Sequence, residues 1–167
     1  MGKFLGLFLV IGFGWALTLP ENFSAIFIQK IINPKGKTLL YRGRLYYKGK
    51  RVFWHYKYPV EKKIWITPLG YIAYEPDLMQ VTISQKPLNL NLSKILKGAK
   101  QVGAGLYIAE VDGKKVYFRY NSTLEEINYT DEVGNRVLIR FVDPSTKPIP
   151  REQFQPSFPA EVDKIYQ

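Results

Sequence analysis

Two neighbouring runs of the sequence decide the fold: Tyr41-Arg-Gly-Arg-Leu-Tyr-Tyr-Lys48 and Arg51-Val-Phe-Trp-His-Tyr-Lys-Tyr58, joined by Gly49-Lys50. Successive side chains of a β-strand point to opposite faces of the sheet, so every second residue shares a face. One face is therefore expected to collect apolar side chains: Tyr41, Leu45, Tyr47, Val52, Trp54, Tyr56 and Tyr58, continued by Ile64 and Ile66. The opposite face is expected to be basic and convex: Arg42, Arg44, Tyr46, Lys48, Arg51, Phe53, His55 and Lys57.

Short aromatic and β-branched runs continue along the chain on both sides of this pair. Turn sequences such as Asn33-Pro-Lys-Gly36, Pro68-Leu-Gly70 and Val133-Gly134-Asn135 separate them. The expected strands are residues 25–32, 38–48, 51–58, 63–67, 71–75, 79–85, 106–111, 115–120, 124–130 and 136–142. This succession predicts one antiparallel meander.

Residues 88–100 interrupt the strand pattern, because apolar residues recur there at helical spacing. This spacing predicts one short amphipathic helix. The helix is either a fixed plug on one mouth of a barrel or a movable lid. Residues 20–27 fit either a helical turn or the start of the first strand. The proline-rich segment 144–167 is expected to form an extended arm that contacts the body through Phe154, Phe158, Val162 and Ile165.

A sheet with one apolar face must cover that face by closing, by packing helices on it or by holding a ligand. One helix is too little for so many strands. Two alternatives follow from the residues alone. The barrel closes on a core filled by its own side chains, or it is incompletely filled and its cavity takes a hydrophobic guest.

The first 16 residues have the pattern of a signal peptide. Lys3 is followed by an apolar run, and the small residues Gly14 and Ala16 are spaced like a cleavage site. A membrane anchor is the alternative, but the apolar run is broken by glycines and is short for a spanning helix, which needs about 20 residues. We therefore expect cleavage near Ala16, export, and one domain over residues 17–167.

Composition excludes several function classes. The 167 residues include no cysteine and a single histidine, His55, so neither a disulfide framework nor a Cys- or multi-His metal site is expected. The formal net charge of +10 fits anionic partners, but export argues against nucleic acid. His55 has no acidic neighbour in sequence to make a serine triad, and no phosphate-binding glycine loop is present. We expect neither an enzyme nor a cofactor.

Several blocks of the chain resemble the LolA family, the periplasmic carriers of outer-membrane lipoproteins. The blocks are Asn22-Phe-Ser-Ala-Ile-Phe-Ile-Gln29, Gly43-Arg-Leu-Tyr-Tyr, Phe53-Trp-His-Tyr-Lys-Tyr-Pro59, Tyr74-Glu-Pro-Asp-Leu-Met-Gln-Val81, the stretch 124–141 and Phe154-Gln-Pro-Ser-Phe-Pro-Ala-Glu-Val-Asp163. They follow the order of the family over nearly the whole chain after residue 16. The resemblance implies a mainly β fold with few helices, an incomplete, unclosed antiparallel β-barrel with a short helical lid.

The resemblance also implies a function and partners. Such a protein is a periplasmic carrier that takes acylated lipoproteins from an inner-membrane LolCDE-like ABC transporter to the outer membrane, with a LolB-like acceptor as a further possible partner. We expect this chain to be a monomer. Burial of an acyl chain contributes ~0.8 kcal/mol per methylene, which supports a hydrophobic cavity as the cargo site. The alternative is a periplasmic lipid-binding or sensing module of the same fold, as in RseB-like regulators.

By positional match to the family, we expect the acyl-chain cavity and its lid to be formed by two sets of residues. The cavity set is Phe23, Phe27, Leu45, Tyr47, Val52, Trp54, Tyr56, Ile64, Ile66, Ile72 and Tyr74, and the lid set is Leu92, Ile95 and Leu96. The chain departs from the family in two ways. The N-terminal amphipathic helix is reduced or missing, and the lid arginine of the family has only Lys48, Lys50 and Arg51 as candidates.

Overall fold

The computed structural model describes residues 17–87 and 92–167, and all of its strands belong to one twelve-stranded sheet. The expected signal peptide and the expected start of the helix at residues 88–91 lie outside the described residues. The first half of the sheet comprises β1 (Asn22–Ile32), β2 (Thr38–Lys48), β3 (Arg51–Tyr58), β4 (Lys62–Thr67), β5 (Gly70–Glu75) and β6 (Gln80–Ser84), with the short 3-10 helix η1 (Pro76–Leu78) between the last two. The second half comprises β7 (Lys100–Gly103), β8 (Leu106–Val111), β9 (Lys114–Asn121), β10 (Thr123–Thr130) and β11 (Arg136–Ser145).

The ten expected strands are all present, and the structure adds two more. Residues 20–27, which the sequence left open between helix and strand, belong to β1 from Asn22 onward. The additional strands are β7 and β12 (Asp163–Tyr166), and both lie at the edges of the sheet. The helix expected over residues 88–100 is α1 (Leu92–Lys97), shorter at its C-terminal end because Lys100 already belongs to β7.

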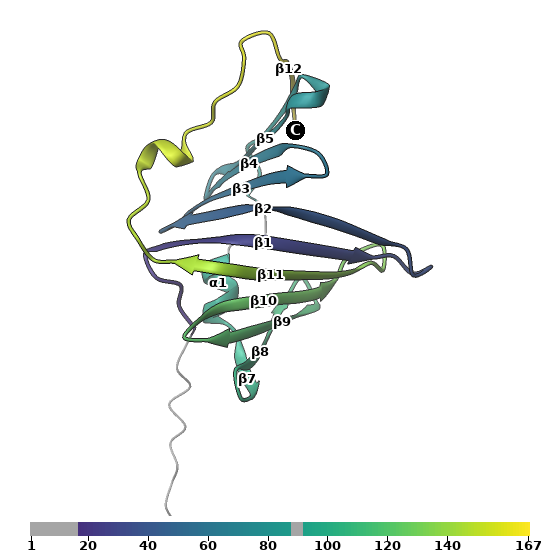
Figure 1. The fold of residues 1–167 in the computed structure, drawn as a ribbon, viewed down its shortest axis with the longest axis vertical. Coiled ribbons are helices and arrows are strands. Elements are labelled where there is room, and N and C mark those ends of the chain that lie inside the picture. The colour runs from purple at the N-terminus through teal and green to yellow at the C-terminus, as the bar shows by residue number, and fades with distance from the viewer. Residues whose placement is uncertain (1–16, 88–91) are drawn as a thin grey trace, which may run out of the picture.

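The two halves of the sheet meet at its centre, where β1 pairs with β2 on one side and with β11 on the other (Figure 1). The strand order is β12-β6-β5-β4-β3-β2-β1-β11-β10-β9-β8-β7. All of these pairs are antiparallel except β12 with β6, which are parallel. Among the described residues the two edge strands do not pair with each other, so the barrel is incomplete, as the resemblance implied.

The concave face of the sheet carries the larger apolar cluster. Phe23, Ala25 and Phe27 of β1 are fully buried in it. Leu45 of β2 and Leu124 of β10 are also fully buried there, together with Leu96 of α1. The helix therefore packs on this face and joins side chains from both halves of the sheet.

The convex face carries a second apolar cluster, so the expectation of a basic convex face is wrong over β3 to β6. Phe53, Trp65, Tyr74 and Val81 are buried there. The rings of Phe53 and Trp65 stack with centroids 5.0 Å apart. The physical reason is that the C-terminal arm covers these strands and excludes water from them.

The C-terminal arm runs across the convex face before it reaches β12 (Figure 1). Ile149, Phe154 and Val162 are buried in the second cluster, and Phe158 packs against it. Phe154 ends the 3-10 helix η2 (Arg151–Phe154). Ile165, which the sequence expected to contact the body, is exposed.

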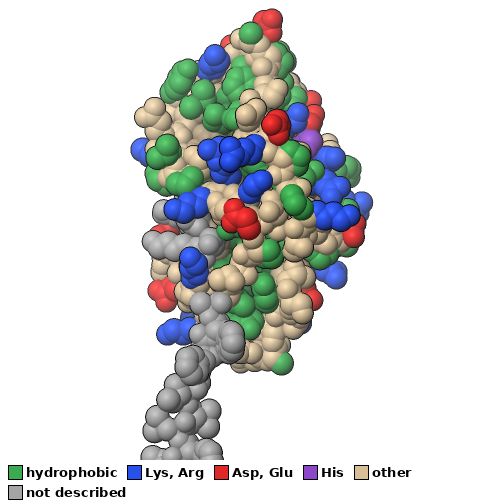
Figure 2. Space-filling view, turned by 90° about the vertical axis from the view of Figure 1, so that its left-hand side faces the viewer, with side chains coloured by type: hydrophobic (Ala, Val, Ile, Leu, Met, Phe, Trp, Pro, Cys, Tyr) green, Lys and Arg blue, Asp and Glu red, His purple; other side chains and the backbone are tan. Residues whose placement is uncertain are grey.

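Two hydrogen bonds connect the start of the C-terminal arm to the end of β2 and to the beginning of β1. Lys48 Nζ donates a hydrogen bond to the carbonyl of Ile149 at 2.7 Å, and the amide of Ile149 donates to Asn22 Oδ1 at 3.0 Å. Figure 2 shows Lys and Arg side chains gathered across this side of the molecule. Of the candidates for a lid arginine, Lys48 therefore contacts the arm, while Lys50 and Arg51 are exposed.

Candidate functional site

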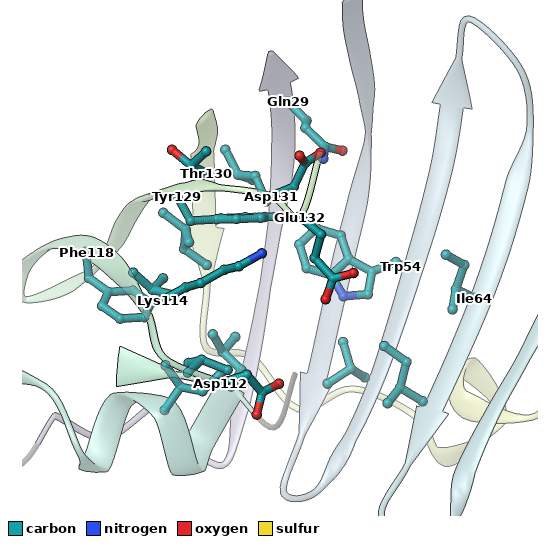
Figure 3. Close-up of a pocket in the computed structure, with 18 of the residues that line it drawn as sticks. Gln29, Trp54, Ile64, Asp112, Lys114, Phe118, Tyr129, Thr130, Asp131 and Glu132 are labelled. Atoms are coloured by element: carbon teal, nitrogen blue, oxygen red, sulfur yellow. The ribbon is translucent and has the colours of Figure 1, made fainter. Parts of the chain in front are cut away.

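A cavity of about 350 Å³ lies on the concave face, between the two halves of the sheet (Figure 3). Its volume is near the lower end of the range of about 300–1,000 Å³ that is common for small-molecule sites. Strands β3 and β4 line one side, strands β9 and β10 line the other, and Leu92 and Ile95 of α1 close part of it. The sequence left two alternatives open, a core filled by its own side chains and an incompletely filled barrel. The structure has the second, because it contains this apolar cavity.

Half of the residues expected to form the cavity or its lid do line it. They are Val52, Trp54, Tyr56, Ile64, Ile66, Leu92 and Ile95. The register explains the grouping, because Val52 pairs with Ile66 and Trp54 pairs with Ile64 across β3 and β4. Residues that face each other in an antiparallel pair share one face of the sheet, and both pairs turn toward the cavity.

Five of the other expected residues belong to the core around the cavity and do not line it. They are Phe23, Phe27, Leu45, Tyr47 and Leu96, all buried in the concave cluster. Phe27 supports two lining rings edge to face, with centroid distances of 5.0 Å to Trp54 and 4.9 Å to Tyr56. These buried residues pack behind the cavity-lining side chains and support them.

The placement of Ile72 and Tyr74 in the cavity is wrong, because both side chains lie on the convex face. Ile64 pairs with Ala73, and Ile66 pairs with Tyr71, across the β4–β5 turn. Ala73 and Tyr71 therefore share the face of Ile64 and Ile66. Tyr74 is instead buried in the convex cluster, and Ile72 packs against that cluster beneath the C-terminal arm.

The lining includes side chains from the second half of the sheet that the sequence analysis did not assign to the cavity. They are Gln29, Val111, Asp112, Lys114, Val116, Phe118, Ile127, Tyr129, Thr130, Asp131, Glu132 and Ile139. For several of these residues, the alternation of apolar and polar residues along the strand could have predicted that they face the cavity. Val116 and Phe118 alternate with the polar or exposed residues Lys115, Tyr117 and Arg119 along β9. Gln29 follows Phe23, Ala25 and Phe27 at the same two-residue period.

A polar pair lies inside this apolar cavity. The Tyr56 hydroxyl donates a hydrogen bond to Gln29 Oε1 at 2.9 Å. Gln29 is only 8% exposed, which is unusual for an amide side chain. Burial raises the pKa of Tyr56, and the neighbouring Tyr129 and Tyr41 raise it further. Burial likewise raises the pKa of Tyr129, with a smaller contribution from Asp131. Both phenols therefore stay neutral at physiological pH.

The turn between β10 and β11 brings carboxylates to the edge of the cavity. Burial by itself would raise the pKa of Asp131, but hydrogen bonds from Asn135 and Val133 outweigh this and lower it. The Asn135 side chain donates to Asp131 Oδ2 at 2.8 Å. Lys114 extends into the cavity beside Tyr129 (Figure 3), and its charge also lowers the pKa of Asp131.

Other chemistry is sparse in the part of the chain that the structure describes. No group of three or more His, Asp or Glu side chains among residues 17–87 and 92–167 could hold a metal ion. His55 Nε2 lies 2.8 Å from Glu61 Oε1 on the convex face, away from the cavity, so the histidine is part of an ion pair or hydrogen bond there. Within the described ranges, no helix is long and apolar enough to cross a membrane.

The curated proteins that resemble this chain in sequence share one name. No family model matches the chain. A protein of Wolinella succinogenes named outer-membrane lipoprotein carrier protein is 31% identical over 152 residues, which cover 87% of this chain and 87% of that protein. A protein of Campylobacter jejuni with the same name is 31% identical over 165 residues, 97% of each chain.

A solved structure shares the fold at lower sequence identity. An uncharacterized conserved protein from Thermus thermophilus superposes with a TM-score of 0.56 and 14% identity, over 89% of this chain and 92% of that one. The open sheet is thus an architecture found in another protein of very different sequence.

Proposed function

Since this chain belongs to the LolA family of outer-membrane lipoprotein carrier proteins, we propose that it carries lipoproteins through the periplasm with their acyl chains in the concave cavity. The observation that carries the proposal is the apolar cavity between the two halves of the sheet, which Trp54, Ile64 and Ile66 line from one side. Each buried methylene contributes ~0.8 kcal/mol, so the cavity offers acyl chains a large gain over water.

In this proposal the protein is exported with its N-terminal 16 residues removed, and residues 17–167 act as one carrier domain. It receives cargo from an ATP-driven LolCDE-like transporter and passes it to the outer membrane, with or without a LolB-like acceptor. External work is needed at the first step because the membrane buries acyl chains about as well as the cavity does. Helix α1 contributes the lid through Leu92 and Ile95, while Leu96 anchors it in the core.

The test is release of a lipoprotein from inner-membrane vesicles that contain the cognate transporter. With ATP and the purified protein, we expect a soluble one-to-one complex of lipoprotein and carrier. Trp54→Glu places a charge in the cavity wall and should abolish release. Ile72→Glu is the matched control, because its side chain lies on the convex face. That variant should still form the complex if it folds, which thermal unfolding checks.

Two results would contradict the proposal in different ways. If no lipoprotein is released but free fatty acids or phospholipids purify with the protein, the function is that of a lipid-binding or sensing module. If Ile72→Glu abolishes release while Trp54→Glu leaves it intact, acyl chains do not occupy the concave cavity.

A further inference from the structure

The cavity is apolar along most of its wall, and a group of polar side chains lies toward one end. Moving along β3 from Val52 to Tyr56 leads from the pair Val52–Ile66, through Trp54–Ile64, to Tyr56 opposite Lys62. Tyr56 is hydrogen-bonded to Gln29, and Gln29 pairs with Ile139 close to the β10–β11 turn. The polar groups therefore gather toward that turn, and Figure 3 shows Gln29, Thr130 and Asp131 together there.

The buried pair has hydrogen-bonding capacity that points to a ligand. The Tyr56 hydroxyl donates a hydrogen bond to the oxygen of the Gln29 amide. The amide nitrogen carries two hydrogens, which can donate to a ligand. Tyr129 lines the same part of the cavity and keeps its phenolic proton, because burial raises its pKa.

The charges around the cavity restrict what that ligand can be. Of the charged lining residues that the structure describes, Asp131 and Glu132 of the β10–β11 turn lie toward the polar end with the single cation Lys114, while Asp112 lies at the opposite end in Figure 3. A free fatty-acid carboxylate or a phosphate at this end would meet an excess of negative charge. Neutral acceptors, such as the carbonyl oxygens of esters and amides, avoid that repulsion and match the donors.

We propose that Gln29, Tyr56 and Tyr129 form a polar subsite that binds the ester or amide carbonyl groups of an acylated ligand. The proposal rests on the proposed function, because it assigns the polar end of the same cavity. It makes the three residues determinants of specificity, which favour neutral acyl esters over free acids. The apolar wall formed by the pairs Val52–Ile66 and Trp54–Ile64 is then left for the acyl chains themselves.

The experiment compares two probes on the full-length protein by fluorescence titration below their micelle-forming concentrations. One probe is a synthetic tripalmitoylated cysteine peptide, and the other is its ether analogue, in which the two ester carbonyls are absent. We expect the wild type to bind the ester probe more tightly. Gln29→Leu and Tyr129→Phe should each reduce this preference about three- to tenfold, the effect of one hydrogen bond, while affinity for the ether probe changes less than about twofold.

A matched control separates recognition from folding. Tyr120→Phe removes a hydroxyl that donates to the carbonyl of Thr18 at 3.1 Å, and Tyr120 packs on the same concave cluster without lining the cavity. This variant should keep the wild-type preference. Tyr56→Phe is the conservative second variant if Gln29→Leu does not fold, and thermal unfolding of each variant checks folding.

The outcomes distinguish the subsite from the carrier function. Equal affinity of the wild type for both probes, or equal weakening of both probes in the variants, would overturn the subsite and leave the cavity as a carrier site. Failure of the wild type to bind either probe would overturn the subsite together with the proposed function. Tighter binding of palmitate than of the ester probe would overturn the assignment to neutral carbonyl groups.

Discussion

At the scale of single residues, Gly43 shows how closely β1, β2 and β3 approach behind the cavity wall. A Cβ at this position would overlap the backbone carbonyl of His55 and lie 2.8 Å from Cε1 of Phe27. Backbone cannot move aside as a flexible side chain can. We expect Gly43→Ala to lower the free energy of unfolding by about 1–3 kcal/mol, measured by urea denaturation.

Gly103 supplies the comparison for this substitution. A Cβ there would meet only the Leu106 side chain, at 3.6 Å. Gly103→Ala should therefore change the unfolding free energy by less than about 0.5 kcal/mol. Equal losses in the two variants would mean that the packing behind the cavity is looser than the structure indicates.

The contact between His55 and Glu61 on the convex face makes the stability of the protein depend slightly on pH. The hydrogen bond with His55 lowers the pKa of Glu61 from its ordinary value of 4.5, and this outweighs the raising effect of burial. A carboxyl whose pKa is lowered on folding stabilises the protein above the ordinary pKa, and this contribution is lost as the pH falls through the lowered value. Because Glu61 is 42% exposed, solvent screening keeps the contribution below about 1 kcal/mol.

The measurement is the difference in melting temperature between wild type and Glu61→Gln at pH 7 and at pH 3. We expect the wild type to be slightly more stable at pH 7 and the difference to shrink at pH 3. A difference that is the same at both pH values would show that the charge of Glu61 contributes nothing to stability.

At the scale of elements, the C-terminal arm is held on the sheet by a few large side chains. Phe154 is 4% exposed and packs with Phe53 and Trp65 in the convex cluster. Phe154→Ala should destabilise the protein by about 3 kcal/mol, since it removes a buried ring and leaves a cavity. Tyr166→Ala in β12 is the control, because Tyr166 is 72% exposed and its loss should cost less than about 0.5 kcal/mol.

Urea denaturation of both variants checks this prediction. If Phe154→Ala is as stable as the control, the arm does not contribute to the folded core, and the convex cluster is held by the sheet alone. Limited proteolysis adds a local readout, because a released arm should be cleaved near Phe154 before the sheet unfolds.

The strands show which parts of the fold sequence can predict. Alternation and turn chemistry located all ten longer strands, because each carries its own apolar period. They missed β7 and β12, which are four residues each and exist through pairing with β8 and β6. A short edge strand carries little local signal, since its backbone partner supplies most of its stability.

The misplacement of Ile72 and Tyr74 has a geometric cause. Thr67 pairs with Gly70 around the two-residue turn Pro68-Leu69, so even-numbered residues of β4 face odd-numbered residues of β5. The small Ala73 consequently faces the cavity while the larger Ile72 and Tyr74 face away. The positional match to the family assigned Ile72 and Tyr74 to the cavity face. The local pattern of β5 could not correct this, because the arm that covers the convex side lies far along the sequence, after β11.

At the scale of the whole molecule, β1 connects the two halves of the sheet and the cavity lies between them. Residues Ile26 to Ile32 of β1 are paired on both sides, with β2 and with β11. The edge strands β7 and β12 pair on one side only, and all four residues of β12 are exposed. Stability should therefore fall from the centre of the sheet toward its edges.

Hydrogen exchange of the native protein, read by residue, measures this gradient and its coupling to the cavity. We expect the amides of β1 to exchange slowest, through global unfolding, and those of β7 and β12 to exchange fastest. Because strands of both halves line the cavity, a bound acylated peptide should slow exchange in β3 and β4 as well as in β9 and β10. Protection confined to one half would mean that the ligand contacts only that wall, and that the second half does not take part in binding.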